Sequence, residues 1–192
     1  MMTDHPMIFS APMVRALLDG RKTQTRRVLG NTYKRVQPGD RFWVKEAWRT
    51  DFGSDHLRPS ELDPAKATVW FDASSDWNEG ERPRHRSARF MPRWASRLTL
   101  SVTDLRVQRV QDISEEDAVA EGIERLVGSN GPNHFSRQIC GKWSGSFNAP
   151  TAREVYADLW DTLHGPDAWD QNDWVVAYTF TVQRGNIDQV KS

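Results

Sequence analysis

The chain has 192 residues, of which 38% are hydrophobic and 27% are charged. This length suits one well-packed core, and this composition excludes a wholly disordered chain. No apolar run approaches the roughly 20 residues of a membrane span, and residues 1–6 lack the features of a secretion signal. The lone Cys140 allows no internal disulfide, so we expect a cytoplasmic protein.

The formal net charge is zero, but the charges are unevenly distributed. Lys and Arg dominate residues 1–50, and in residues 82–110 many arginines stand against Asp104 alone. The acids concentrate at 112–124 and 154–173. Two basic segments folded side by side would attract phosphates. Alternatively, these segments are solvated faces balanced by nearby acids.

A first helix is predicted close to the start of the chain. Ser10 stands in the N-cap position and Pro12 in the first turn, where its missing N–H costs little. Apolar residues then recur at helical spacing until Gly20, which favours a helix end. We therefore expect a helix over about 11–19.

Alternating apolar residues predict several β-strands. The strongest pattern covers 97–110 in two runs, formed by Leu98, Leu100 and Val102, then by Leu105, Val107 and Val110. Shorter patterns lie at 41–48, 68–71 and 174–182.

Two capping boxes predict later helices. Residues 114–117 begin a helix that runs to about Glu121, with Gly122 as its end, and residues 151–154 begin one that ends at Gly165.

Five or six strands with two or three short helices indicate a single α+β domain, built on a small curved sheet or barrel. Polar stretches at about 50–66, 73–90 and 127–150 are interpreted as insertions into that one domain. Trp43, Trp160 and Trp174 lie in apolar patterns and are expected in the core.

Residues 20–27, here called the basic octet, follow the first predicted helix and read Gly-Arg-Lys-Thr-Gln-Thr-Arg-Arg. Gly20 allows a turn with positive φ, while Lys22 and Arg27 bring two cations close to the hydroxyl of Thr25. Burial and neighbouring cations both lower the pKa of a lysine, which can make it a base.

The basic octet resembles the signature of the ASCH family, relatives of the PUA RNA-binding fold. That signature is Gly-x-Lys-x-x-Glu-x-Arg after an N-terminal helix; Gly20, Lys22 and Arg27 match it, and Thr25 replaces the glutamate. Further similarity, above all to ASCH proteins of phages and prophages, lies at 38–44, 91–97, 112–118 and the closing strand. The resemblance implies a PUA-like β-barrel with flanking short helices.

One bacterial branch of that family, the N4-acetylcytidine amidohydrolases, is similar in having Gly-Arg-Lys-Thr-x-Thr-x-Arg at this place. By position, the resemblance implies that Lys22 is the proton acceptor, Thr25 the nucleophile and Glu121 the proton donor. Amide hydrolysis needs these three roles. The nearby glutamates Glu115, Glu116 and Glu124 are alternatives for the last one.

The oxyanion of such a reaction could be stabilised by Arg26, Arg27 or main-chain N–H groups. The alternative to an enzyme is a non-catalytic RNA- or DNA-binding module, in which Thr25 bonds the turn and Glu121 pairs with an arginine. A ribonuclease is less favoured, because the sequence offers no histidine pair for acid–base cleavage.

Substrate or nucleic-acid binding is predicted for further residues beside this set. Trp94 is flanked by cations and could stack on a base, or be a core or rim residue. The arginine run at 82–89 could be an electrostatic arm or a loop. The predicted binding residues are Arg21, Arg26, Arg27, Arg93, Trp94 and Arg97.

The five histidines show no metal-ligand spacing, and no phosphate-binding or dinucleotide fingerprint occurs. We expect no metal and no cofactor. The expected partner is a nucleoside, a nucleotide or a single-stranded nucleic acid.

Overall fold

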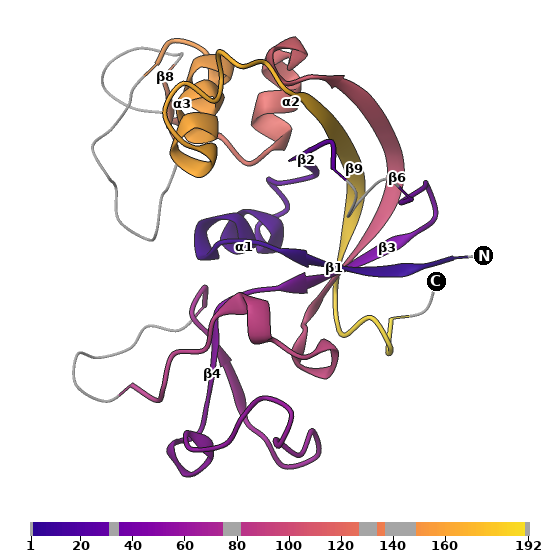
Figure 1. Ribbon diagram of the computed structural model, residues 1–192, viewed down its shortest axis with the longest axis vertical. Helices are drawn as coiled ribbons and strands as arrows, with labels where there is room; N and C mark the ends of the chain where they lie inside the picture. Colours follow the sequence, from indigo (N-terminus) through magenta and orange to yellow (C-terminus); the bar gives the residue numbers. More distant parts are fainter. Residues whose placement is uncertain (1, 31–34, 75–81, 127–133, 137–148, 191–192) are drawn as a thin grey trace.

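The computed structural model describes residues 2–30, 35–74, 82–126, 134–136 and 149–190. Its centre is a five-stranded sheet in the order β1-β3-β6-β9-β2 (Figure 1). These strands are β1 (Asp4–Ile8), β2 (Gln24–Val28), β3 (Arg41–Lys45), β6 (Leu98–Arg109) and β9 (Trp174–Arg184). β1 and β3 are parallel, and the other neighbours are antiparallel. β1 and β2 form the two edges, so the described strands are not closed into a barrel.

The two longest strands, β6 and β9, pair along their whole length and give the sheet its curved shape (Figure 1). The predicted pattern at 97–110 is confirmed as one continuous strand. The register shifts between Val102 and Asp104, which leaves Thr103 as a bulge. This extra residue explains why the apolar positions change from even to odd numbers within one strand.

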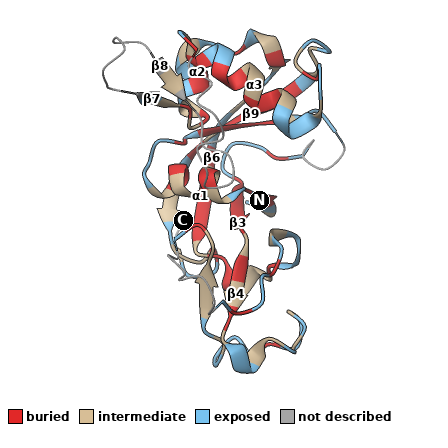
Figure 2. Ribbon diagram, turned by 90° about the vertical axis from the view of Figure 1, so that its left-hand side faces the viewer, coloured by how far each residue is buried: buried red, intermediate tan, exposed pale blue. Residues whose placement is uncertain are grey.

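The predicted helices are confirmed as α1 (Ala11–Leu18), α2 (Glu115–Ala120) and α3 (Ala152–His164). Buried residues concentrate along the sheet and on the helix faces that meet it (Figure 2). α1 packs in one cluster with Val176 and Tyr178, whereas α2 and α3 pack in a second with Val175. Alternate residues of a strand face opposite sides, so β9 serves both cores.

A smaller unit lies below the sheet in Figure 1. It contains a two-stranded sheet of β4 (Trp48–Thr50) and β5 (Val69–Phe71) around a third cluster with Trp48 at its centre. The pattern at 41–48 therefore belongs to two strands, β3 and β4, not to one. Three 3₁₀ turns accompany this unit: Phe52–Ser54, Ala88–Phe90 and Arg93–Ala95.

The remaining elements surround α2 and α3. A 3₁₀ turn at Val110–Asp112 follows β6, and β7 (Glu124–Leu126) pairs with β8 (His134–Ser136). Most of the insertion predicted at 127–150, and residues 75–81 of that at 73–90, lie outside the described residues. Within the described ranges, no helix combines the length and the apolar character needed to cross a membrane.

The expectation for tryptophans holds for Trp43 and Trp160, which are buried, and is wrong for Trp174, which is 47% exposed. Trp174 begins β9 at the end of the sheet. The guanidinium group of Arg109 lies 4.4 Å from its ring centre. A cation over its ring, rather than the core, is the environment of this side chain.

Candidate functional site

The first half of the basic octet is fixed by the end of α1. Gly20 has a φ of 71°, and its N–H donates to the carbonyl of Leu17, while the N–H of Arg21 donates to that of Ala16. This pair of bonds is the Schellman helix ending, which favours glycine. The N–H of Lys22 also donates to Ala16, so the backbone of the lysine is held at the helix end.

The second half of the octet is strand β2, which the sequence analysis did not predict. It is an edge strand that pairs with β9. Side chains alternate along a strand, so Thr25 and Arg27 share one face while Gln24 and Arg26 share the other. The hydrogen bonds follow this division: Arg27 donates to Thr25, and Arg26 donates to Gln24.

Lys22 is joined to Glu121 at the end of α2. Its Nζ donates to the Oε2 atom and to the main-chain carbonyl of Glu121, each at 2.7 Å. Lys22 is 2% exposed and Glu121 4% exposed, so this is a buried ion pair. Glu121 is the C-cap of α2, where the negative end of the helix dipole favours a cation. Gly122, with a φ of 100°, ends the helix as predicted.

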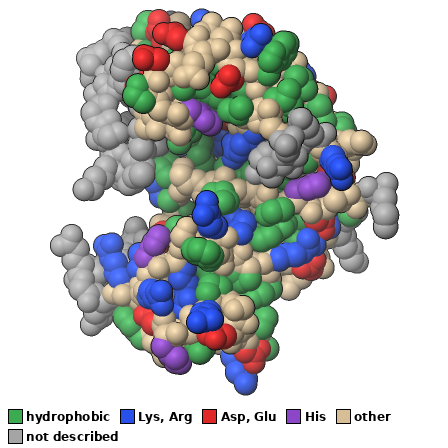
Figure 3. All heavy atoms as spheres, viewed as in Figure 1, with side chains coloured by type: hydrophobic (Ala, Val, Ile, Leu, Met, Phe, Trp, Pro, Cys, Tyr) green, Lys and Arg blue, Asp and Glu red, His purple; other side chains and the backbone are tan. Residues whose placement is uncertain are grey.

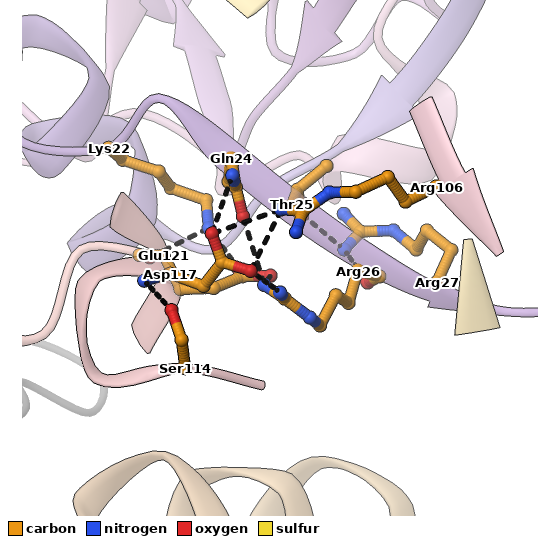
Figure 4. Close-up of polar contacts among 9 residues, drawn as sticks. All are labelled: Lys22, Gln24, Thr25, Arg26, Arg27, Arg106, Ser114, Asp117 and Glu121. Atoms are coloured by element: carbon orange, nitrogen blue, oxygen red, sulfur yellow. Dashed lines mark hydrogen bonds and ion pairs between the residues drawn. The ribbon is translucent and has the colours of Figure 1, made fainter. Parts of the chain in front are cut away.

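Arg26 connects this ion pair to a second carboxylate, that of Asp117 (Figure 4). Its guanidinium group donates to Glu121 Oε1 at 3.2 Å and to Asp117 Oδ2 at 2.7 Å. Gln24 and Arg106 also donate to Asp117. Sequence reasoning missed Asp117, although its i, i+4 spacing from Glu121 places both carboxylates on one helix face.

The hydroxyl of Thr25 accepts a hydrogen bond from Arg27 at 2.7 Å. Arg27 also donates to the main-chain carbonyls of Arg26 and Ile8. The described residues include no hydrogen bond between Lys22 and Thr25. Thr25 therefore lies beside a cation that can stabilise negative charge on its oxygen.

These side chains line one cavity of about 520 Å³. Lys22, Thr25, Arg26, Arg27 and Glu121 form its polar wall. α3 contributes an aromatic and apolar wall, and His85 and Ser87 approach from the smaller unit. A groove at this level separates the upper and lower parts of the molecule, with histidines on both edges (Figure 3). The volume suits a ligand of nucleoside or drug size.

Burial dominates the proton affinities in the cavity. It lowers the pKa of Lys22; the charge of Glu121 opposes this shift, and those of Arg27 and Arg26 add to it. Burial also raises the pKa of Tyr156 well above its ordinary value, and the charge of Glu121 adds to this. The pKa of His164 is lowered by burial and by the charge of Arg27.

Arg21, Arg93, Trp94 and Arg97 do not line this cavity. Arg21 is exposed and pairs with the carboxylate of Asp19. The remaining three pack elsewhere: Arg93 with Asp4 and Asp188, Arg97 with Glu46 and the Phe71 ring, and Trp94 edge-on against Trp48. The structure thus brings Arg26 and Arg27 together with the predicted catalytic residues, and not the other four.

The arginines of the run at 82–89 differ in their burial. Arg86 is buried and donates to the carbonyls of Leu57 and Ser54 and to the hydroxyl of Thr50, so it holds the smaller unit together. Arg84 and Arg89 are exposed.

Among the described residues, no group of three or more His, Cys, Asp or Glu side chains is arranged to hold a metal ion.

Neither a family model nor a curated protein matches this chain. Among solved structures, it is similar to the crystal structure of a protein from Enterococcus faecalis V583 described by the family model DUF984. The two share 12% sequence identity, over 91% of this chain and 69% of that chain, with a TM-score of 0.39. This similarity supports no conclusion about function.

Proposed function

We propose that this chain is an ASCH-type domain of the PUA-like class that hydrolyses the N4-acyl amide of a cytosine nucleoside. The observation that carries the proposal is the convergence of Lys22, Thr25 and Glu121 on one cavity. The lysine and the glutamate are 99 positions apart in the chain and in direct contact. In this proposal, the curved sheet corresponds to the wall of the PUA-like barrel.

The Lys22–Glu121 pair can supply both a base and an acid. Burial lowers the pKa of Lys22 and so favours its neutral amine. In the proposed first step, one proton passes from the ammonium group of Lys22 to the carboxylate of Glu121, which gives a neutral amine and a carboxylic acid. The amine then takes the proton of the Thr25 hydroxyl. For this step the Lys22 side chain has to move toward Thr25, because Lys22 is hydrogen-bonded to Glu121 and Thr25 to Arg27.

The oxygen of Thr25 attacks the acyl carbonyl carbon and forms a tetrahedral intermediate. Arg27, already 2.7 Å from the Thr25 oxygen, stabilises the negative charge that this oxygen carries as its proton leaves. The carbon–nitrogen bond breaks as Glu121 gives its proton to the departing amine, which leaves cytidine and a threonine ester. A second proton transfer from Lys22 to Glu121 restores the neutral amine, which takes a proton from water. The resulting hydroxide hydrolyses the ester, and Glu121 gives its proton to the Thr25 oxygen as the carboxylic acid leaves.

Conversion of N4-acetylcytidine to cytidine, followed chromatographically, tests this reaction. We expect turnover by the wild-type protein, loss of about 10³-fold or more in Thr25→Ala and Lys22→Ala, and retained turnover in Thr25→Ser. Arg21→Ala is the control in the same octet, because Arg21 does not line the cavity. Absence of turnover, or turnover unaffected by Lys22→Ala, contradicts the proposal.

A second candidate function is a non-catalytic binding module for RNA or DNA. The observation that favours it is the direct ion pair of Lys22 with Glu121, which leaves the hydroxyl group of Thr25 bonded to Arg27 alone among the described residues. This function predicts salt-sensitive oligonucleotide binding that is weakened by Arg89→Ala, without product formation. No affinity for oligonucleotides at low salt excludes it.

A further inference from the structure

Tyr156 lies on α3 and lines the same cavity as the basic octet. The residue is 3% exposed. Its ring packs 6.1 Å from that of Trp160 and 6.3 Å from that of Trp169, between centroids. The guanidinium group of Arg26 lies 6.0 Å from the Tyr156 ring. These contacts hold the ring in place beside the cavity.

The hydroxyl group of Tyr156 has no hydrogen-bond partner within the part of the chain that the structure describes. A ligand in the cavity that Tyr156 lines can therefore accept a hydrogen bond from this hydroxyl group. Burial and the charge of Glu121 keep the phenol protonated, because both raise its pKa. Tyr156 is therefore a donor, not a base, at neutral pH.

The terminal nitrogens of the two arginines that sequence reasoning assigned to the oxyanion are used elsewhere. Arg26 directs its terminal nitrogens to Gln24, Glu121 and Asp117. Arg27 directs its terminal nitrogens to the hydroxyl of Thr25 and to two main-chain carbonyls. An amide hydrolase needs a donor for the carbonyl oxygen as it becomes negative, and tyrosine hydroxyls serve in this way.

We infer that the Tyr156 hydroxyl donates a hydrogen bond to the carbonyl oxygen of the acyl group bound in the cavity. This inference rests on the proposed amidohydrolase function and adds a catalytic residue to it. It also defines the ligand class: the site recognises an N-acylated base through its acyl carbonyl, in preference to the same base without an acyl group.

The test compares Tyr156→Phe with wild type on N4-acetylcytidine. We expect kcat to fall by about 100-fold, as for the loss of one oxyanion donor, while KM rises by less than about tenfold. The control is Tyr178→Phe, which also removes a tyrosine hydroxyl. Tyr178 packs against Phe42 in the core and does not line the cavity. This variant should keep wild-type kcat. Unchanged kcat in Tyr156→Phe overturns the inference while leaving the proposed function intact.

Binding measurements decide the case in which wild type shows no turnover and the proposed function fails. Calorimetry measures the affinities of wild type and Tyr156→Phe for two ligands. These are N4-acetylcytidine and N4-methylcytidine, which lacks the acyl carbonyl. We expect the variant to lose about threefold to tenfold in affinity for the acetyl compound only. Equal affinities of both proteins for the acetyl compound, or equal losses for both ligands, overturn the inference.

Discussion

The ammonium group of Lys22 donates to both the carboxylate and the main-chain carbonyl of Glu121, at 2.7 Å in each case. The lysine leaves the end of α1, and the glutamate caps the end of α2. The contact therefore joins two helix ends while it assembles the polar wall of the cavity. Stability and the proposed chemistry depend on the same pair, so variants must be designed to separate them.

Replacement of Lys22 by Met should destabilise the protein by about 3–5 kcal/mol, because Glu121 then stays buried without its lysine partner. The double variant Lys22→Met with Glu121→Leu should recover most of this loss, since an apolar pair can substitute for a buried ion pair. Neither variant should turn over N4-acetylcytidine. Urea unfolding measures the stability, and a single variant as stable as wild type contradicts the expectation.

The pH dependence of kcat/KM should have a falling limb that reports loss of the proton that Lys22 and Glu121 share, because the proposed reaction passes this proton from the lysine to the glutamate. Burial and two arginines lower the pKa of Lys22 below its ordinary value of 10.5, so the limb should lie below that pH. Arg27→Gln removes one of these cations, which raises the lysine pKa and shifts the limb to higher pH. Arg109→Gln, at the far end of β6, is the control. A limb that stays in place in Arg27→Gln argues against Lys22 as the base.

Asp117 is expected to contribute more to the stability of the fold than Arg106, which reaches it from the surface. Asp117→Asn removes the charge that faces the fully buried Arg26 side chain, at a cost of about 2–3 kcal/mol. Arg106 is 44% exposed in its side chain, and Arg106→Ala should cost less than about 1 kcal/mol. Thermal and urea unfolding of the two variants provide the comparison. Equal losses would mean that Arg26 does not depend on Asp117.

The arginine run at 82–89 offers a matched pair of substitutions. Arg86→Ala leaves buried acceptors of the smaller unit unsatisfied and should cost at least about 2 kcal/mol. Arg89→Ala changes an exposed side chain and should stay within about 0.5 kcal/mol. Any oligonucleotide affinity should respond to Arg89 instead. If the two variants unfold alike, Arg86 is not a structural residue.

Asp4 should contribute to the loss of stability in acid. Burial opposes its ionisation, but hydrogen bonds from Arg41 and Arg93 outweigh this and lower the pKa of Asp4 below 3.8. The unfolded chain thus takes up the proton first, so the contribution is complete above pH 3.8 and is lost as pH falls through the lowered value. Asp4→Asn should cost about 1–3 kcal/mol at pH 7, with the difference from wild type shrinking in acid.

Urea unfolding between pH 2 and pH 7 measures this effect. Asp188→Asn removes a more exposed carboxylate that also binds Arg93, and it should cost less at every pH. A constant difference between Asp4→Asn and wild type across this range contradicts the assignment.

Elements whose signal lies in their own residues could be predicted from the sequence. The helix caps at Ser114 and Thr151 and the alternation of β6 are of this kind. Strand β2 could not be predicted, because Gln-Thr-Arg-Arg-Val has little β-pattern and becomes a strand by pairing with β9. Trp174 was misassigned for a related reason, since an apolar pattern does not show where a sheet ends.

The same distinction applies to the candidate site. Lys22, Thr25 and Glu121 were suggested by a family resemblance, and their meeting in one cavity is a property of the fold. Asp117 lies in α2, whose sequence pattern indicates a capped helix start, and Tyr156 lies on the buried face of α3. Neither pattern indicates a site residue. The positions of Asp117 and Tyr156 beside Arg26 depend on how α2 and α3 pack on the sheet, which local sequence does not encode.

The turn through the basic octet also has a consequence for local unfolding. The N–H of Lys22 is bonded to Ala16 at the end of α1, and the N–H of Thr23 donates to Ala120 at the end of α2, at 2.9 Å. Neither helix end can fray without disturbing this turn. In native-state hydrogen exchange, the amides of Lys22 and Thr23 should therefore open with both helix ends, as one cooperative unit.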